Sequence, residues 1–172
     1  AVAALRAELH VCGAPKPLED TAFVNLRLAG GAPGVLHASQ AAPGEANGLR
    51  LRLWGARGAL EWDQECPETL RHTPLGEAPR TIRRGRGAGM LPGAERLVHL
   101  PRGHGEGLTD AWANLYAEMG LAVAARRIGA ALPDGLIVVP GSAEGARGVR
   151  FVAACVDSDA AGGAWRSLAE DG

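Results

Sequence analysis

The residues best placed to do chemistry lie in a glycine-rich loop with the sequence Pro101-Arg-Gly-His-Gly-Glu-Gly107. Glycines flank His104 and Glu106, so a ligand can approach the backbone closely there. A neutral imidazole can donate and accept a hydrogen bond, and a carboxylate accepts several, which suits a hydroxylated ligand. We therefore predict that both residues bind hydroxyl groups. The alternative for His104, given equal weight, is a structural role in tying the loop to a sheet.

Motifs that would make the chain a self-contained catalyst are missing from the sequence. The glycine clusters at 85–89 and 103–107 lack the third glycine of the dinucleotide fingerprint and an acidic residue about twenty positions later. The nucleophile elbow, the paired zinc histidines and the phosphate-binding lysine loop are absent as well. Cys12, Cys66 and Cys155 form no Cys-x-x-Cys pair. We expect this chain itself to bind no cofactor and no metal.

The composition points to one ordinary globular domain spanning residues 1–172. The chain has a formal charge of −1, with 47% hydrophobic and 22% charged residues, so nothing favours nucleic acid as a partner. No apolar run is long enough to cross a membrane and no apolar leader is present, which predicts a cytoplasmic protein. One basic cluster could bind phosphate, but without interleaved aromatic residues it is interpreted as a solvated loop: Arg80, Arg83, Arg84 and Arg86.

Two helices are predicted from apolar residues at spacings of three and four. The first begins after Gly107, and its apolar stripe is wide enough to cover a sheet: Leu108, Ala111, Trp112, Leu115, Tyr116, Met119, Ala122 and Val123. The second is expected to be capped by Ser142 and to end at Gly162-Gly163. Its predicted apolar side consists of Val149, Val152, Ala153, Val156 and Ala160.

Strands are predicted where apolar and polar residues alternate, at 4–12, 22–28, 35–41, 50–53, 60–63, 69–73, 79–83 and 164–168. The hairpin around Gly55–Gly58 has the best-defined register, which pairs Leu53 with Leu60, Arg52 with Glu61, Leu51 with Trp62 and Arg50 with Asp63. We expect helices to cover its apolar face, and its charged face to be solvated or used in an isologous subunit contact.

This order of elements predicts an α+β fold, an open-faced and mostly antiparallel sheet with helices packed on one face. Four stretches then resemble the C-terminal half of the Gfo/Idh/MocA oxidoreductases, the glucose-fructose oxidoreductase and inositol dehydrogenase family. They are residues 39–52, 55–62, 103–107 with 113–116, and 145–151. The resemblance covers nearly the whole chain and implies a fold like the C-terminal domain of dihydrodipicolinate reductase.

The resemblance implies that an N-terminal Rossmann domain for NAD or NADP, with the catalytic lysine, aspartate and histidine, precedes Ala1 in the complete protein. This chain would then shape a sugar or polyol pocket and form a homodimer or homotetramer through its sheet, without activity of its own. His104 and Glu106 would bind substrate hydroxyls, with Gln40 and Asn47 as further candidates. Lys16 lies in a turn and does not correspond to the family's catalytic lysine.

Two residues depart from the family's usual Gly-His-Pro-Glu-Gly-Tyr loop. Gly105 replaces the proline and Leu108 replaces the aromatic residue, which predicts a looser loop and an altered pocket contact. The alternative to the enzyme interpretation is a stand-alone, non-catalytic module that binds sugar or acts as a scaffold. We expect neither nucleic acid nor a membrane among the partners.

Overall fold

The computed structural model of the chain describes residues 1–85, 90–132 and 139–168. The chain divides into two compact units: residues 1–44 with 140–172 form unit 1, and residues 45–139 form unit 2. All the described strands pair antiparallel, which confirms the predicted α+β class. The strands form two four-stranded sheets, one in each unit, where the sequence predicted one sheet.

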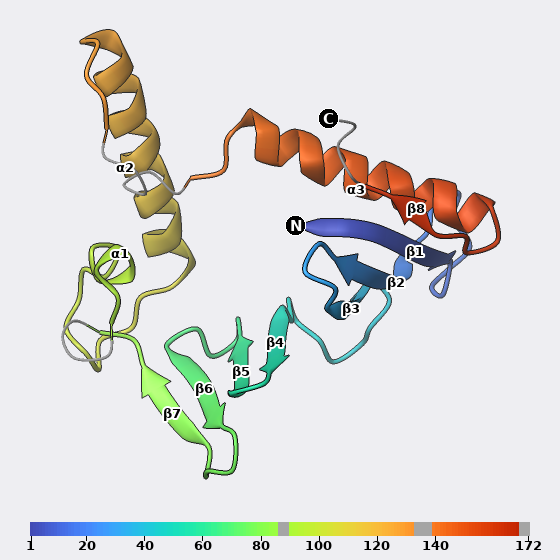
Figure 1. The fold of residues 1–172 in the computed structure, drawn as a ribbon, viewed down its shortest axis with the longest axis horizontal. Helices are drawn as coiled ribbons and strands as arrows, with labels where there is room; N and C mark the ends of the chain where they lie inside the picture. The colour runs from blue at the N-terminus through green and yellow to red at the C-terminus, as the bar shows by residue number, and fades with distance from the viewer. Residues whose placement is uncertain (86–89, 133–138, 169–172) are drawn as a thin grey trace. The chain divides into compact units, whose positions relative to one another are not determined.

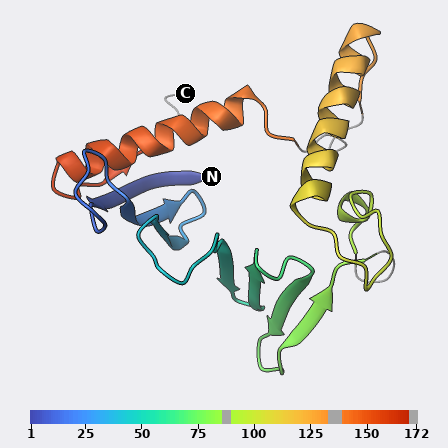
Figure 2. The same cartoon turned by 180° about the vertical axis from the view of Figure 1, so that it is seen from behind.

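Unit 1 is a four-stranded sheet with a helix along one face (Figure 1, Figure 2). The strand order is β3-β2-β1-β8. The elements are β1 (Val2–His10), β2 (Thr21–Leu28), β3 (Pro33–Ser39), α3 (Ser142–Ala160) and β8 (Arg166–Ser167). The turn between β1 and β2 contains Lys16, as predicted, and its ammonium lies 3.0 Å from the buried carboxylate of Asp20.

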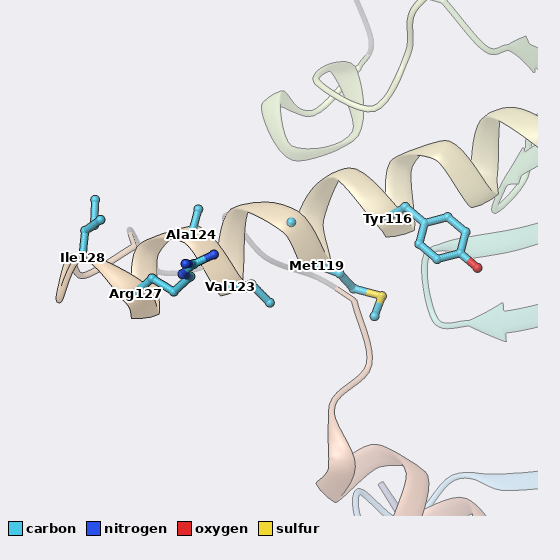
Figure 3. Close-up of a pocket in the computed structure, with 7 residues that line it drawn as sticks. Tyr116, Met119, Val123, Ala124, Arg127 and Ile128 are labelled. Carbon is cyan, nitrogen blue, oxygen red and sulfur yellow. The ribbon is translucent and has the colours of Figure 1, made fainter.

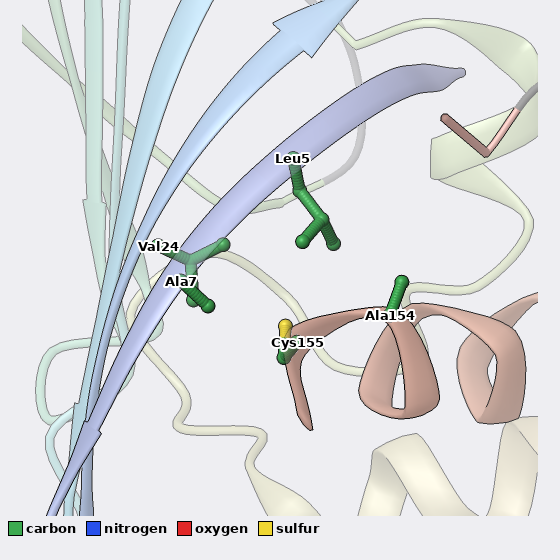
Figure 4. Close-up of a cluster of buried hydrophobic side chains, with 5 residues drawn as sticks. All are labelled: Leu5, Ala7, Val24, Ala154 and Cys155. Atoms are coloured by element: carbon green, nitrogen blue, oxygen red, sulfur yellow. The ribbon is translucent and has the colours of Figure 1, made fainter. Parts of the chain in front are cut away.

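Small and branched side chains form the core of unit 1. Alternate residues of the strands, Leu5, Ala7 and Val24, point towards α3 and meet Ala154 and Cys155 (Figure 4). Leu5 is completely buried and Val24 is 1% exposed. Burial in this apolar core raises the pKa of the Cys155 thiol.

The predicted apolar side of α3 is wrong. Val149 and Val152 are 71% and 62% exposed, and the helix instead turns Phe151, Ala154, Cys155 and Ser158 towards the sheet. Both sets have helical spacing, but in the second Ala154 and Cys155 pack in the core and Ser158 bonds to the Ala7 N–H of β1.

The C-terminal turn of α3 closes the edge of β1. Short β8 pairs only with Ala4 and Leu5. Beyond it, the Ser158 hydroxyl accepts a hydrogen bond from the Ala7 N–H (2.9 Å), and the Asp159 carboxylate accepts one from the Leu9 N–H (2.9 Å). Ser158 also donates to the Ala164 carbonyl at 2.7 Å. These side chains satisfy backbone groups that would otherwise form an open strand edge.

Unit 2 contains the second sheet, in the order β4-β5-β6-β7. Its elements are β4 (Arg50–Gly55), β5 (Gly58–Asp63), β6 (Thr69–Pro74), β7 (Arg80–Arg83), α1 (Pro92–Glu95) and α2 (Leu108–Arg127). The predicted hairpin register is confirmed at all four pairs. On its charged face Arg50 lies 3.1 Å from Asp63, whereas Glu61 lies 3.6 Å from Arg71.

Within the described residues of unit 2, no helix covers the apolar face of this hairpin, in contrast to the prediction. Leu51 and Leu53 are each 54% exposed. Among the residues that the structure describes in unit 2, no extensive packing joins α2 to β4–β7.

The helix α2 forms as predicted, but a different face is buried. Its inward side contains Asn114, which donates to the Leu97 carbonyl (2.9 Å), and Glu118, which lies 2.6 Å from Arg96. Trp112 and Tyr116, from the predicted stripe, are 51% and 65% exposed. Polar contacts with residues 96–99 therefore decide the orientation of α2 within unit 2. The predicted apolar stripe does not decide it.

The helix ends follow the predicted chemistry with one correction. Asp110 accepts a hydrogen bond from the Gly107 N–H, and Glu144 from the Gly141 N–H, each at 2.9 Å. The cap of α3 is therefore Gly141, and Ser142 is the first helical residue. Gly162 and Gly163 end α3 with φ of 67° and 79°, the left-handed conformation that glycine adopts most easily. No described helix is both long and apolar enough to cross a membrane.

Candidate functional site

The loop that contains His104 is a tight turn leading into α2. The His104 N–H donates to the Pro101 carbonyl at 3.1 Å, and Gly103 has a φ of 94° at the centre of this turn. A side chain at position 103 would be strained in that conformation. The turn leaves His104 exposed. The imidazole is therefore accessible to a ligand, while its backbone belongs to an ordered turn.

Glu106 lies two residues further on and is buried, with 9% exposure. One carboxylate oxygen accepts hydrogen bonds from the His99 N–H (2.7 Å) and from the Leu100 N–H. The other oxygen lies 2.9 Å from the Nη1 atom of Arg84. The carboxylate thus ties the loop to the segment before it. Direct contact with a substrate hydroxyl stays a prediction for this residue.

Arg84 connects this loop to β6 and β7. Its Nε and Nη2 atoms donate to the two carboxylate oxygens of Glu68 at 3.0 and 2.9 Å. Nη2 also donates to the His104 carbonyl at 2.7 Å. The Glu106 N–H in turn donates to Glu68 at 2.9 Å. We call the three side chains of Glu68, Arg84 and Glu106 the ion-pair cluster.

The cluster contains two carboxylates and one guanidinium, so its formal charge is negative. Hydrogen bonds from Arg84 lower the pKa of the Glu68 carboxyl, and the Glu106 N–H lowers it further. The same contact with Glu68 is the main cause of the raised pKa of Arg84. The charged forms of Glu68 and Arg84 therefore stabilise each other.

Two of the four predicted site residues share a contact in the structure. His104 and Glu106 share Arg84 as a contact. Asn47 lies just before β4 in unit 2, exposed, where its carbonyl accepts a hydrogen bond from Gln64 at 3.2 Å. Gln40 is an exposed residue of unit 1 whose N–H donates to the Asp20 carbonyl at 2.8 Å.

The sequence did not identify Arg84 or Glu68 as part of the site. Arg84 belongs to the cluster interpreted as a solvated loop, but its side chain is only 18% exposed, so that interpretation is wrong for this residue. Arg80 does remain exposed, paired with Glu77, and Arg86 lies outside the described residues. Pairing the predicted strands 69–73 and 79–83 could have revealed this contact. With Thr69 opposite Arg83, Glu68 lies opposite Arg84.

Two cavities lie apart from these residues. A shallow groove of about 590 Å³ follows the second half of α2, where Tyr116, Met119 and Val123 point outwards (Figure 3). A second hollow of about 670 Å³ surrounds the turn between β4 and β5. Neither is lined by a candidate site residue. Within the described parts of the chain, no three histidine, cysteine or acidic residues form a potential metal site.

The described architecture defines a class of protein, an α+β domain of antiparallel strands in which a glycine-rich loop leads into a long helix. Residues 1–166 match a family described as the oxidoreductase family, C-terminal alpha/beta domain, of the Gfo/Idh/MocA type. The chain belongs to this family. The predicted family resemblance is thereby confirmed.

Relatives and solved structures agree with this assignment. The chain is 32% identical over 155 residues to an uncharacterized oxidoreductase of Bacillus subtilis (strain 168), YfiI, covering 89% of this chain and 39% of that protein. An oxidoreductase from Sinorhizobium meliloti is 38% identical, with a TM-score of 0.86 over 97% of this chain and 47% of the other. An inositol dehydrogenase homolog from Azotobacter vinelandii, solved with NADH and myo-inositol, is 32% identical, with a TM-score of 0.87 over 97% and 44%. The chain therefore spans less than half the length of these proteins.

Proposed function

We propose that this chain is the substrate-binding and oligomerising domain of an NAD(P)-dependent sugar or polyol oxidoreductase, and that it is not catalytic on its own. The observation that carries the proposal is the family match over residues 1–166 together with the share of the relatives that the chain covers. The Azotobacter homolog, solved with NADH and myo-inositol, supports a nicotinamide cofactor and a hydroxylated substrate.

In this proposal, the complete protein supplies the nicotinamide site and the proton-transfer groups from a Rossmann domain. Hydride passes between a carbinol carbon of the substrate and the nicotinamide. The residues of this chain bind and orient the substrate hydroxyls, and none of them is assigned to the cofactor.

His104 is the leading substrate contact in this proposal. Its imidazole is exposed on a backbone that the turn and the ion-pair cluster hold in place. Such a group can exchange hydrogen bonds with a hydroxyl without large loss of conformational freedom. Gln40 and Asn47 are exposed amides that can do the same. Glu106 contributes at the least by fixing the loop, through the hydrogen bonds that it accepts from His99 and Leu100.

The first experiment tests the activity. The complete polypeptide that contains this chain should oxidise at least one member of a panel of sugars and cyclitols, including myo-inositol, with NAD or NADP. The reduced cofactor is followed by absorbance. Failure with every panel member and both cofactors, in a folded protein, would overturn the enzyme proposal and favour a non-catalytic module.

The second experiment tests the role of His104. His104→Ala is expected to raise KM about tenfold and to change kcat less. The lost contact stabilises the bound substrate and the transition state equally. His10→Ala, a change at a partly exposed histidine at the end of β1, is the control and should leave both constants unchanged. A loss confined to kcat would make His104 a participant in the chemical step and not a binding group.

A further inference from the structure

We propose that Arg84 is a positioning residue for substrate binding, acting through the backbone of His104. This inference rests on the proposed function, since it assigns Arg84 a task at the same site. It begins from one observation: a single guanidinium contacts Glu68, the His104 carbonyl and the Glu106 carboxylate.

The contacts of Arg84 use all three nitrogen atoms of its planar guanidinium group. Nε and Nη2 match the two oxygens of Glu68, a bidentate pairing that fixes the plane of the group. With that plane fixed, Nη2 also reaches the His104 carbonyl and Nη1 faces Glu106. A lysine ammonium has the same charge but no such fork, so it cannot hold these partners in one geometry.

The loop is held on both sides of position 105. Before it, the His104 carbonyl accepts a hydrogen bond from Arg84. After it, the Glu106 N–H donates to Glu68, and the Glu106 carboxylate faces Arg84. Two adjoining peptide groups are thus fixed to the Arg84–Glu68 pair. The His104 imidazole remains exposed, so the cluster orders the backbone from which this ring projects without occupying the ring.

These contacts matter more with glycine at position 105 than they would with the proline of the family's usual loop. Glycine has wide backbone freedom, and a Cβ placed there would meet no neighbouring atom within 4 Å. Local sequence therefore does little to restrict the loop between His104 and Glu106. We infer that the ion-pair cluster supplies the restriction, and that its loss lets the imidazole sample positions that do not bind substrate.

The test uses the complete polypeptide and three variants. Arg84→Lys keeps the charge and removes the fork. Arg80→Lys is the matched control, because Arg80 begins β7, the strand that Arg84 directly follows, and pairs with exposed Glu77. His104→Ala, alone and combined with Arg84→Lys, shows whether the two residues act together.

Arg84→Lys is expected to raise KM about tenfold with kcat within about twofold of the parent value, whereas Arg80→Lys changes neither. In the His104→Ala background, Arg84→Lys should raise KM no further, because the group that it positions is gone. An unchanged KM in folded Arg84→Lys would overturn the inference, and so would an equal rise of KM in both backgrounds.

If Arg84→Lys does not fold, Glu68→Gln takes its place. This variant keeps an oxygen that can accept from the Glu106 N–H but weakens the orientation of Arg84. A rise of KM that depends on His104 supports the inference, and an unchanged KM overturns it.

Absence of any oxidation by the parent polypeptide would overturn the proposed function and leave the positioning role to be measured directly. Amide hydrogen exchange in the chain itself then provides the readout. Exchange at residues 101–107 should accelerate in Arg84→Lys and stay at the parent rate in Arg80→Lys. Equal exchange in both variants would contradict the inference without reference to activity.

Discussion

Glu68 is the acceptor on which the geometry of Arg84 depends. Both of its oxygens take part, and one of them also accepts the Glu106 N–H. Protonation of this carboxyl would remove the charge that aligns the guanidinium. The ionisation of Glu68, just before β6, is thereby linked to the backbone of the loop at residues 101–107.

This link predicts a pH dependence of stability. The pKa of Glu68 is lowered in the folded chain, first by the hydrogen bonds from Arg84. Such a group stabilises the folded state above its unfolded pKa of about 4.3, and this contribution is lost as the pH falls through the lower folded value. Glu68→Gln should therefore lower Tm near neutral pH, and the difference from the parent should shrink below about pH 4.

Thermal unfolding followed by circular dichroism measures this difference. Glu77→Gln, at the exposed pair with Arg80, is the control and should change Tm less near neutral pH. A Tm difference for Glu68→Gln that persists undiminished in acid would show that its carboxylate charge contributes nothing.

At the scale of the elements, the end of α3 is a structural anchor of unit 1. Ser158 is completely buried and bridges the Ala7 N–H and the Ala164 carbonyl. Its hydroxyl therefore connects β1 to the turn before β8. Hydrophobic burial positions the helix, and this hydroxyl fixes its distance from the strand edge.

Ser158→Ala is expected to lower the free energy of unfolding by about 1–3 kcal/mol, because the buried Ala7 N–H and the Ala164 carbonyl lose their partner. Ser142→Ala provides the contrast. The structure places it at the first helical position and not at the cap, so its cost should be below about 0.5 kcal/mol. Urea denaturation of the chain measures both. A cost of about 1 kcal/mol for Ser142→Ala would restore its predicted capping role.

The sequence predicted the strands and the hairpin register because these depend on local alternation and on pairing of neighbours. Closing the hairpin around Gly55–Gly58 satisfies both faces at once, and a shift of one residue satisfies neither. The left-handed turn at Gly162 and Gly163 was likewise predictable, since it depends on residue type alone.

The buried faces of the helices were not predictable in this way. On α3, two stripes have helical spacing, and in the buried one Cys155 packs in the core while Ser158 bonds to the Ala7 N–H of β1. On α2, Asn114 and Glu118 face inward because residues 96 and 97 present a charge and a carbonyl to them. Partners distant in sequence decided both cases, and the same is true of Arg84.

At the scale of the whole chain, the family assignment covers residues 1–166, while the relatives are more than twice as long. We propose that the complete protein associates with copies of itself through a sheet face. The exposed leucines of β4, Leu51 and Leu53, support this proposal because large exposed apolar residues on a sheet commonly mark an interface.

Leu53→Lys tests this association. In the complete polypeptide, a charge at this position should shift the mass measured by light scattering after gel filtration towards a smaller species, because an unpaired charge is costly in an interface. Leu75→Lys is the control, since Leu75 is also exposed but follows β6 in a turn. An unchanged mass for Leu53→Lys would exclude this part of β4 from the interface.

The closed edge of β1 has a consequence for misassembly. With Ala7 and Leu9 engaged by Ser158 and Asp159, a foreign strand cannot pair with these residues of β1. In the sheet as described, β3 is the other terminal strand, and it begins at Pro33, a residue that cannot donate to a neighbouring strand. Both features therefore hinder amyloid-like strand addition, the first at the part of β1 beyond β8 and the second at the start of β3.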